Sequence, residues 1–363
     1  MPRRTATMLA SLLMLIALLC AGLLIPVPYS EMSPGPTYNT LGSHEGECVL
    51  QISGQKGCET TGGHLNMTTV RVTGSEYKMN LVEAVYGWLA HDEVVVPHST
   101  LYPDDKTADE VNQENAEEFT QSQESAKVAA LRQLGKKVKA HVIVARVERD
   151  KPAQGKLHAG DVIKEVDGSP VRSAEDVAKL ITKHKPGEKV VFTVVPAKDA
   201  AAAEKQNKEA TRRESVTVTT EKAKEDGRAI VGIGPGVDYT FPLKIDIKLA
   251  DVGGPSAGLM FALGIVDRLS PGDLTGGKFI AGTGTIDDMG TVGPIGGIQM
   301  KTIGARKAGA EYFLTPQENC AAAAADKPGG LTLVKVHTLD GAMKALKQIR
   351  AGDTAALPKC AKG

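Results

Sequence analysis

The chain has 363 residues, of which 42% are hydrophobic and 24% are charged. These values are typical of globular proteins and exclude a disordered chain, a collagen-like repeat and a polytopic membrane protein. Basic and acidic residues number 43 each, so no net charge attracts a nucleic acid. Aromatic residues make up only 4%, which argues against a platform for base stacking. The length favours two or three domains, and local sites must carry the function.

The first predicted element is an apolar segment at residues 8–27. It contains no charged residue and is long enough to cross about 30 Å of hydrocarbon as a helix. Two arginines precede it and few basic residues follow it, so we expect residues 1–7 to be a cytoplasmic stub and the rest extracytoplasmic. The alternative is a cleaved signal peptide with a weak cleavage site at residues 20–22, but the apolar run continues past that site. We therefore expect a transmembrane helix or signal anchor, single-pass in the lipid bilayer of the cell membrane.

Four of the five cysteines follow this segment, on the side where thiols tend to be oxidised. Four cysteines allow three pairings. Closeness in sequence favours Cys48 with Cys58 and Cys320 with Cys360, and the second bridge would clip the C-terminal tail, residues 351–363, to the last domain. No spacing resembles a zinc site, and we expect neither a metal nor a cofactor.

The region of residues 28–135 contains three predicted elements. Residues 62–74 alternate polar and apolar side chains between glycines, which predicts a strand. Residues 81–89 form a short amphipathic pattern, which predicts a helix. A further helix is expected before Gly135, because alanines and leucine recur at helical spacing up to that glycine.

Turn and period signals over residues 141–196 predict a small domain of strands with one helix. We expect two strands, a turn at Gly160-Asp161, a third strand, a turn at Asp167-Gly168, a helix capped by Ser173 and a last strand. A polar insertion at residues 198–213 predicts a flexible loop.

Several motifs of this stretch resemble a PDZ domain, namely Pro152-Ala153, Gly160-Asp161-Val162-Ile163, Val166-Asp167-Gly168 and Pro170-Val171. The resemblance implies a domain at residues 136–225 that binds peptide segments and recruits substrates or regulates activity. A Gly-Leu-Gly-Phe-type carboxylate loop is missing before Val142, so the peptide-binding residues are not assigned.

The strongest chemical signal begins at residue 243, where a strand over residues 243–249 leads to a Gly-Gly-Pro turn and an apolar helix that opens at Ser256. Pro255 fits the first helical position, and the helix that runs to Leu269 must be buried. A serine at a buried helix start lies among free backbone N–H groups, which can stabilise an oxyanion. The alternative is that Ser256 only caps its helix.

A second helix is predicted over residues 298–308, after Gly296-Gly297. Lys301 lies in its first turn, where the helix dipole disfavours a cation and lowers the lysine pKa, as a lysine base requires. The alternative is a solvated lysine beside Arg306 and Lys307.

These segments resemble the proteolytic domain of the Lon family of serine proteases. The resemblance is carried by Gly254-Pro255-Ser256-Ala257-Gly258, Thr283-Gly284, and Pro294-Ile295-Gly296-Gly297 through Lys301.

The Lon resemblance implies a Ser-Lys dyad. Ser256 corresponds to the nucleophile, Lys301 to the base and Thr283 to the residue that holds the lysine, while Gly254 and Pro255 support the nucleophile. Where the family has a lysine and an aspartate before the nucleophile motif, this chain has valine and glycine. This departure leaves the acidic role open to Asp251.

Together the two resemblances predict an α+β fold, in which a Lon-type proteolytic domain at residues 226–350 carries an inserted PDZ domain and follows one N-terminal transmembrane helix. Residues 28–135 are expected to contribute strands to the proteolytic domain. No GxxxxGK[ST] phosphate loop is present, so we expect no ATP as a partner. The predicted function is an ATP-independent serine endopeptidase that acts on unfolded or flexible extracytoplasmic polypeptides. The family resemblance also allows a homo-oligomer.

Two other functions remain open from the sequence. A catalytically silent PDZ adaptor or scaffold would tolerate loss of Ser256 or Lys301, and both are present. A Ser-His-Asp hydrolase would need a histidine such as His337, but no histidine stands in a recognisable motif. A metalloprotease is excluded because the chain has no HExxH motif.

Overall fold

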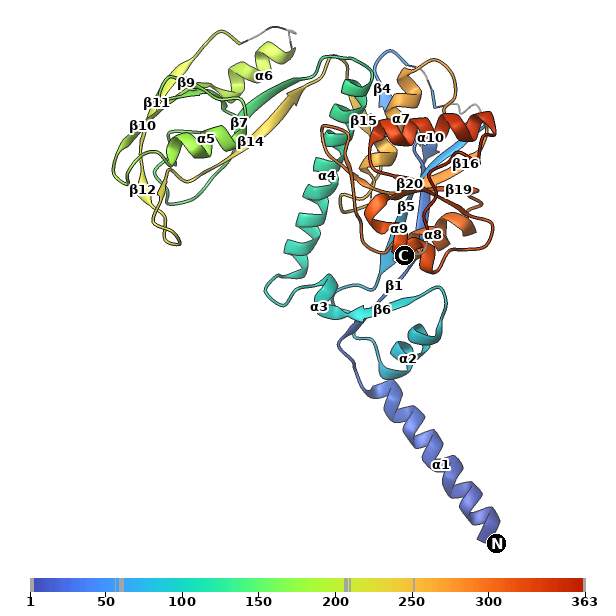
Figure 1. The fold of residues 1–363 in the computed structure, drawn as a ribbon. Helices are drawn as coiled ribbons and strands as arrows, with labels where there is room; N and C mark the ends of the chain where they lie inside the picture. Colours follow the sequence, from blue (N-terminus) through green and yellow to red (C-terminus); the bar gives the residue numbers. More distant parts are fainter. Residues whose placement is uncertain are drawn as a thin grey trace. The chain divides into compact units, whose positions relative to one another are not determined.

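The computed structural model describes residues 3–55, 57–58, 62–205, 208, 210–250 and 252–361. The chain divides into two compact units. The larger unit combines Met1–Lys136 with Leu243–Gly363, and the inserted unit is Lys137–Pro242. The larger unit is therefore built from two stretches of chain that lie far apart in sequence (Figure 1).

A six-stranded mixed sheet forms the centre of the larger unit, in the order β20-β19-β16-β5-β1-β6. Its strands are β1 (Tyr29–Asn39), β5 (His64–Val72), β6 (Val94–Pro97), β16 (Phe279–Gly282), β19 (Tyr312–Pro316) and β20 (Thr332–Val336). Strand β16 pairs in parallel with β5 and β19, whereas β1 is antiparallel to β5 and β6. Half of this sheet precedes the inserted unit in the chain, so residues on both sides of the insertion build one framework.

Two helices pack together in the core of the larger unit. Helix α7 (Gly258–Leu269) is buried along most of its length, because nearly all of its side chains are apolar. Helix α4 (Ala108–Gln133) packs alongside it, and the rings of Phe119 and Phe261 meet edge to face with centroids 5.8 Å apart. Helix α4 thereby connects the region before the insertion to the segment that follows it.

Helix α8 (Ile298–Lys307) packs closely on β1. A Cβ atom added at Gly304 would lie 3.3 Å from the carbonyl oxygen of Gly35, so this glycine permits the close approach. The remaining helices of the larger unit are α1 (Arg3–Leu24), α2 (Leu81–Leu89), α3 (His98–Leu101), the 3-10 turn η1 (Gln317–Asn319), α9 (Cys320–Ala325) and α10 (Leu339–Ala351). Small two-stranded sheets pair β2 (Ser43–His44) with β3 (Glu47–Cys48), β4 (Leu50–Ile52) with β15 (Ile245–Ile247), and β17 (Thr285–Ile286) with β18 (Val292–Gly293).

Several local predictions are confirmed in the larger unit. Helix α2 has the predicted bounds and begins with a capping box in which Asn80 and Glu83 bond each other's backbone N–H groups. The strand expected over residues 62–74 is β5. Helix α1 is long and apolar enough to cross a membrane by length and composition, and its side chains are largely exposed.

Two disulfide bonds join the cysteines in the pairs expected from their spacing. The Cα atoms are 5.4 Å apart in the Cys48–Cys58 bridge and 5.0 Å apart in the Cys320–Cys360 bridge. The second bridge fastens the C-terminal segment to the start of α9, beside the pairing of Lys359 with β20. Cys20 on α1 is the free cysteine among the described residues.

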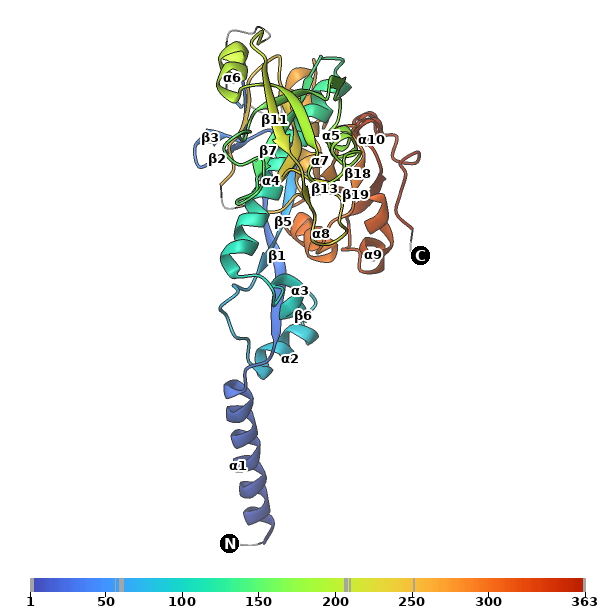
Figure 2. The same ribbon diagram turned by 90° about the vertical axis from the view of Figure 1, so that its left-hand side faces the viewer.

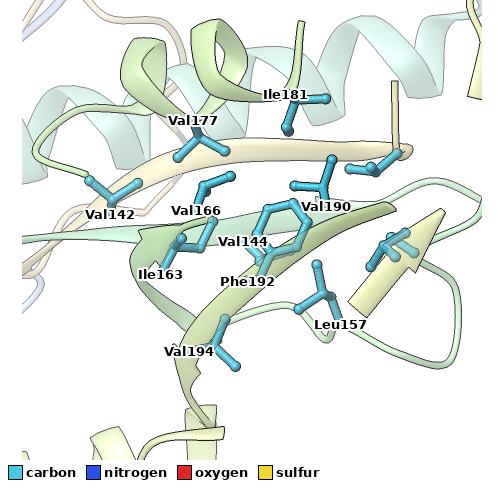
Figure 3. Close-up of a cluster of buried hydrophobic side chains, with 13 residues drawn as sticks. Val142, Val144, Leu157, Ile163, Val166, Val177, Ile181, Val190, Phe192 and Val194 are labelled. Carbon is cyan, nitrogen blue, oxygen red and sulfur yellow. The ribbon is translucent and has the colours of Figure 1, made fainter. Parts of the chain in front are cut away.

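The inserted unit contains a six-stranded sheet, in which five strands follow the order β11-β10-β8-β7-β14 and β9 pairs with β8, and a separate two-stranded sheet of β12 and β13. Its elements are β7 (Lys139–Val147), β8 (Val162–Val166), β9 (Ser169–Pro170), α5 (Ala174–Ile181), β10 (Lys189–Val195), α6 (Ala197–Lys205), β11 (Glu214–Thr219), β12 (Glu221–Lys222), β13 (Ala229–Ile230) and β14 (Ile233–Thr240). Figure 3 shows the core, in which Val177 and Ile181 of α5 face valines of the sheet and the ring of Phe192. The predicted cap at Ser173 is confirmed, because its side chain accepts from the backbone N–H of Asp176.

Three details of the inserted unit differ from the expectations. Only one strand, β7, forms before the Gly160-Asp161 turn, because residues 150–157 are a run of turns. Much of the loop expected at residues 198–213 is helix α6, in line with the high helix propensity of its alanines. The unit also extends past residue 225 to Pro242, because β14 pairs with β7 along its whole length.

Candidate active site

Ser256 lies in an irregular turn immediately before α7. The helix begins at Gly258, and its N-cap is Ala257, which makes no side-chain capping bond. The expected helix start at Ser256, with Pro255 in the first helical position, is therefore wrong. The physical reason is that the carbonyl oxygens of Pro255 and Ser256 accept hydrogen bonds from Ser122 and Gly284, outside the helix.

The side chain of Ser256 meets Lys301. The distance from Lys301 Nζ to Ser256 Oγ is 2.7 Å, so the two groups share one hydrogen bond. Ser256 is half-buried, and its hydroxyl contacts the lysine instead of capping α7. The structure therefore brings together the serine and the lysine that the sequence singled out, although they are 45 residues apart.

Lys301 is a buried lysine. It lies in the first turn of α8, and only 3% of the residue is exposed. Burial lowers the pKa of its ammonium group from 10.5 to about 7, because desolvation penalises the charged form. No charged neighbour among the described residues contributes to this shift. Because the pKa is about 7, a substantial fraction of Lys301 is neutral near neutral pH. The alternative of a solvated lysine is thereby excluded.

The Thr283-Gly284 segment binds both members of the pair. Thr283 is fully buried, and its Oγ1 lies 3.1 Å from Lys301 Nζ and donates to the carbonyl oxygen of Ser256 at 2.9 Å. The backbone N–H of Gly284 donates to the same carbonyl at 2.9 Å. A Cβ atom at Gly284 would lie 2.8 Å from Val292 Cγ1, so only glycine fits there. This segment thus fixes the turn at Ser256 and the lysine to one another.

Helix α4 supplies contacts to the turn at Ser256 that the sequence did not predict. Ser122 is 4% exposed, and its Oγ donates to the carbonyl oxygen of Pro255 at 2.8 Å. The N–H of Gly254 donates to the carbonyl oxygen of Asn115 at 2.9 Å, with Gly254 in the left-handed region at φ 80°. Ser122 lies 133 residues before Pro255, and no local motif marks it.

A cavity of about 320 Å³ opens beside the pair. Ser256 and Lys301 line it together with Val252 and Gly253, and β1 and β5 supply another wall. The wall residues are Pro36, Tyr38, Met67, Thr68, Thr69, Val70 and Arg71. The cavity therefore requires strands that precede the insertion as well as the segments that follow it.

Two other residues from the sequence interpretation can be located. Asp251, considered for the acidic role, lies outside the described residues. His337 is exposed at the end of β20, and no histidine is among the described residues that line the cavity. The geometry therefore gives no support to a Ser-His-Asp arrangement at Ser256.

Comparison with protein families identifies two domains. Residues 250–346 match the family model of the Lon protease (S16) C-terminal proteolytic domain, and residues 119–203 match the PDZ domain model. Lon protease 1 of Sorangium cellulosum is 39% identical over 101 residues, which are 27% of this chain and 12% of that protein. The chain thus corresponds to a small part of this relative's length. Ser256 and Lys301 lie within residues 250–346, the part that matches the proteolytic family model.

Among solved structures, the PDZ domain of an SdrC-like protein from Listeria monocytogenes is 26% identical and covers 26% of this chain and 86% of its own, with a TM-score of 0.21. The PDZ domain of an SdrC-like protein from Listeria innocua is 27% identical and covers 26% of this chain and 92% of its own, also with a TM-score of 0.21. The predicted resemblances to a PDZ domain and to a Lon-type proteolytic domain are confirmed by the family matches.

Proposed function

We propose that this chain, which combines a Lon-type proteolytic domain with a PDZ domain, is an ATP-independent serine endopeptidase that uses Ser256 as nucleophile and Lys301 as general base. Thr283 holds the lysine, and Gly254 and Pro255 shape the turn that presents the serine. The observation that carries this proposal is the contact of Lys301 Nζ, buried and with its pKa lowered to about 7, with Ser256 Oγ at 2.7 Å.

In the first step, neutral Lys301 accepts the proton of the Ser256 hydroxyl while Oγ attacks the carbonyl carbon of the scissile peptide bond. The resulting ammonium donates its proton to the leaving amine, and an acyl-enzyme forms at Oγ. Water then attacks the ester while Lys301 again accepts a proton. The resulting ammonium donates that proton to Ser256 Oγ as the ester bond breaks and the second product leaves. Among the described residues that line the cavity, the ionisable side chains besides Lys301 are Tyr38 and Arg71. A guanidinium group has donors but no acceptor, so Arg71 does not compete with Lys301 as a base.

Ser122 has a positioning role in this scheme. A trans peptide unit directs its C=O and N–H to opposite sides. Because Ser122 binds the Pro255 carbonyl, the N–H of Ser256 is directed to the other side, and no described residue accepts a hydrogen bond from it. This N–H is free to stabilise the oxyanion of the tetrahedral intermediate.

The substrates we propose are unfolded or flexible polypeptides. The chain contains no GxxxxGK[ST] loop that would bind ATP for unfolding. Hydrolysis of an unfolded protein and of a fluorogenic peptide, without nucleotide, tests the activity. We expect both to be cleaved by the unaltered chain and neither by Ser256→Ala. Equal hydrolysis rates for the unaltered chain and for Ser256→Ala, or no hydrolysis by either, would favour the catalytically silent adaptor.

For the PDZ domain we propose that it recruits extended segments by strand addition. Strand β14 lies at the end of its sheet, so its outer edge pairs with no strand among the described residues, and α5 packs beside it. A weak tether of this kind raises the effective concentration of a long substrate near the proteolytic domain.

Replacement of the inserted unit by a short Gly/Ser linker tests recruitment. The two ends of the unit lie side by side, because Lys139 pairs with Thr240 in the β7–β14 ladder. We expect the variant to cleave a short peptide at the unaltered rate and an unfolded protein more slowly. A parallel loss of both activities in a folded variant would instead mean that the PDZ domain shapes the active site, and a parallel gain would mean that it acts as a lid.

We further propose that α1 anchors the chain in the cell membrane with both units on the extracytoplasmic side. The two disulfide bonds support this side, because thiols are oxidised there. Resistance to alkaline extraction, together with digestion by protease added to spheroplasts with an intact cytoplasmic membrane, tests the arrangement. A chain that is protected in spheroplasts and digested only after their lysis would contradict it.

A further inference from the structure

Helix α2 presents large apolar side chains outward. Tyr86 is 66% exposed, Trp88 is 54% exposed and Leu89 is 83% exposed. Leu81 and Val85 are exposed as well, and the one charged side chain of the helix is Glu83, which belongs to the capping box. Contiguous apolar surface of this kind is rare on soluble monomers and marks a surface with a partner.

The orientation of α2 is the reverse of that of a helix on a soluble protein. At about 100° per residue, the five exposed apolar residues fall on one continuous arc of the helix. The opposite side carries Ala84 and Gly87, which are buried against the domain. A Cβ atom at Gly87 would lie 2.6 Å from Val95 Cγ2, so the helix rests closely on β6 through its smallest residues. Trp88 meets the ring of Tyr29 edge to face, with centroids 5.4 Å apart, but more than half of its surface and most of the surface of Tyr86 and Leu89 stay exposed.

Helix α2 lies at the C-terminal end of α1. The N–H of Val27 donates to the carbonyl of Met79 at 2.8 Å, and the N–H of Leu81 donates to the carbonyl of Ile25 at 3.1 Å. A Cβ atom at Gly22 would lie 3.1 Å from Val82 Cγ2, so the two helices also touch through side chains. Both ribbon views show α2 beside this end of α1 (Figures 1 and 2).

We infer that the exposed face of α2 lies in the lipid interface of the bilayer that α1 spans. This inference rests on the proposed membrane anchor. The apolar surface of α1 continues to its last residues, with Leu23 at 55% and Leu24 at 82% exposure, and the face of α2 follows directly from it. Tryptophan and tyrosine are the residues that concentrate at the boundary between headgroups and acyl chains.

This surface would hold the larger unit to the membrane by a second contact besides the span. A helix that lies in the interface buries its apolar face at the boundary of headgroups and acyl chains. The proteolytic domain is then fixed near the bilayer surface and does not swing freely on a tether. A lipid surface is thus the partner that the exposed apolar side chains of α2 fit.

Trp88 allows a direct test, because it is the single tryptophan in the chain. The full chain is reconstituted in phosphatidylcholine and phosphatidylglycerol vesicles that contain phospholipids brominated near the carbonyl end or near the methyl end of the acyl chain. We expect bromine near the carbonyl end to quench Trp88 fluorescence most strongly, and aqueous acrylamide to quench it weakly. Trp88 that is quenched by acrylamide and not by either lipid would overturn the inference.

A control moves the reporter away from the surface. The double variant Trp88→Phe, Met289→Trp places the tryptophan at an exposed position of the larger unit, because Met289 is 79% exposed. Its tryptophan should be quenched by acrylamide and not by lipid. If Trp88 of the unaltered chain is protected from both quenchers, another protein surface, such as a second copy, covers α2 and lipid does not.

A second variant separates this inference from the anchor and from catalysis. Leu89→Asp places a charge on the most exposed position of α2, so we expect loss of lipid quenching of Trp88 with unchanged hydrolysis of a short peptide. Alkaline extraction of the same vesicles reports on α1. Release of the unaltered chain would refute the anchor, whereas retention without lipid quenching would refute the role of α2 alone.

Discussion

Two lysines of helix α8 show how position on one helix decides chemistry. Lys301 in the first turn is buried, has no ion-pair partner among the described residues, and has a pKa lowered to about 7. Lys307 in the last turn has a side chain that is 59% exposed, and its Nζ lies 2.6 Å from Asp92 Oδ2. The first lysine faces a serine in a cavity and the second faces water and a carboxylate.

The difference teaches that desolvation, more than charge, prepares Lys301 for its proposed role. The contact with Lys307 lowers the pKa of Asp92, because the neighbouring cation favours the charged carboxylate. A buried ammonium without a carboxylate gives up its proton readily, so it can act as a base. The comparison makes Lys307 a matched control for Lys301.

The largest expected effect is loss of hydrolysis when the buried lysine is removed. Lys301→Met should abolish cleavage of a fluorogenic peptide, because no base then accepts the Ser256 proton, whereas Lys307→Met should cleave at the unaltered rate. Steady-state kinetics with circular dichroism as a check of folding make the comparison.

The double variant Ser256→Ala, Lys301→Met sharpens this prediction. Two groups that act as a unit give a double loss no larger than either single loss. If the folded double variant instead lost activity by the product of the two single losses, the serine and the lysine would act independently. That result would count against the dyad.

A smaller loss is expected from Ser122→Ala. Without its hydroxyl the peptide unit between Pro255 and Ser256 is no longer held, and the N–H of Ser256 is less well aligned for the oxyanion. We expect kcat to fall by about ten- to a hundredfold with little change in KM. Thr120→Ala, which removes an exposed hydroxyl from the same helix, should leave both constants unchanged.

A peptide boronate separates positioning by Ser122 from a general loss of stability. Its tetrahedral adduct on Ser256 needs the oxyanion donors, so its inhibition constant should rise with the fall in kcat. Partial unfolding would lower the concentration of active sites and leave the inhibition constant unchanged. An unchanged constant in Ser122→Ala would therefore refute the positioning role.

The pH dependence follows from the lowered pKa of Lys301. The base must be neutral, so kcat/KM should rise with pH along a limb whose midpoint lies near the pKa of about 7, and then reach a plateau. An ordinary lysine would place the midpoint near 10.4. His337→Gln should leave the midpoint unchanged, and disappearance of the limb in that variant would identify a histidine as the base.

The smallest effect concerns the exposed lysine and its partner. Asp92→Asn removes the ion pair with Lys307, and exposed pairs of this kind contribute little to stability because water and salt screen them. We expect the thermal unfolding midpoint and the activity to match those of the unaltered chain. A clear fall of the thermal unfolding midpoint in Asp92→Asn would show that this exposed ion pair stabilises the fold, contrary to the expectation from its exposure.

Local sequence signals predicted the elements whose determinants lie close together in the chain. The bounds of α2 and the cap at Ser173 follow from neighbouring residues, and both are confirmed. The family motifs marked Ser256 and Lys301, which the structure places in contact.

The remaining features depend on contacts between distant segments. The start of α7 was mispredicted because Ser122 and Gly284, far from Pro255 in sequence, draw the preceding carbonyl groups away from the helix. The closure of the PDZ sheet by β14 depends on its pairing with β7, and no local pattern shows this partner. The apolar pattern of α2 predicted a helix but not that its large residues face outward.

The most direct test of the proposed dyad is the rate at which a serine-directed peptide phosphonate labels the chain as a function of pH, with the labelled residue identified by mass spectrometry. We predict labelling at Ser256, with a rate that rises through a midpoint near 7 in the unaltered chain and in Lys307→Met, and that is lost in folded Lys301→Met. Labelling of Lys301→Met at the unaltered rate, or labelling at another serine, would contradict the assignment of Lys301 as the base of Ser256.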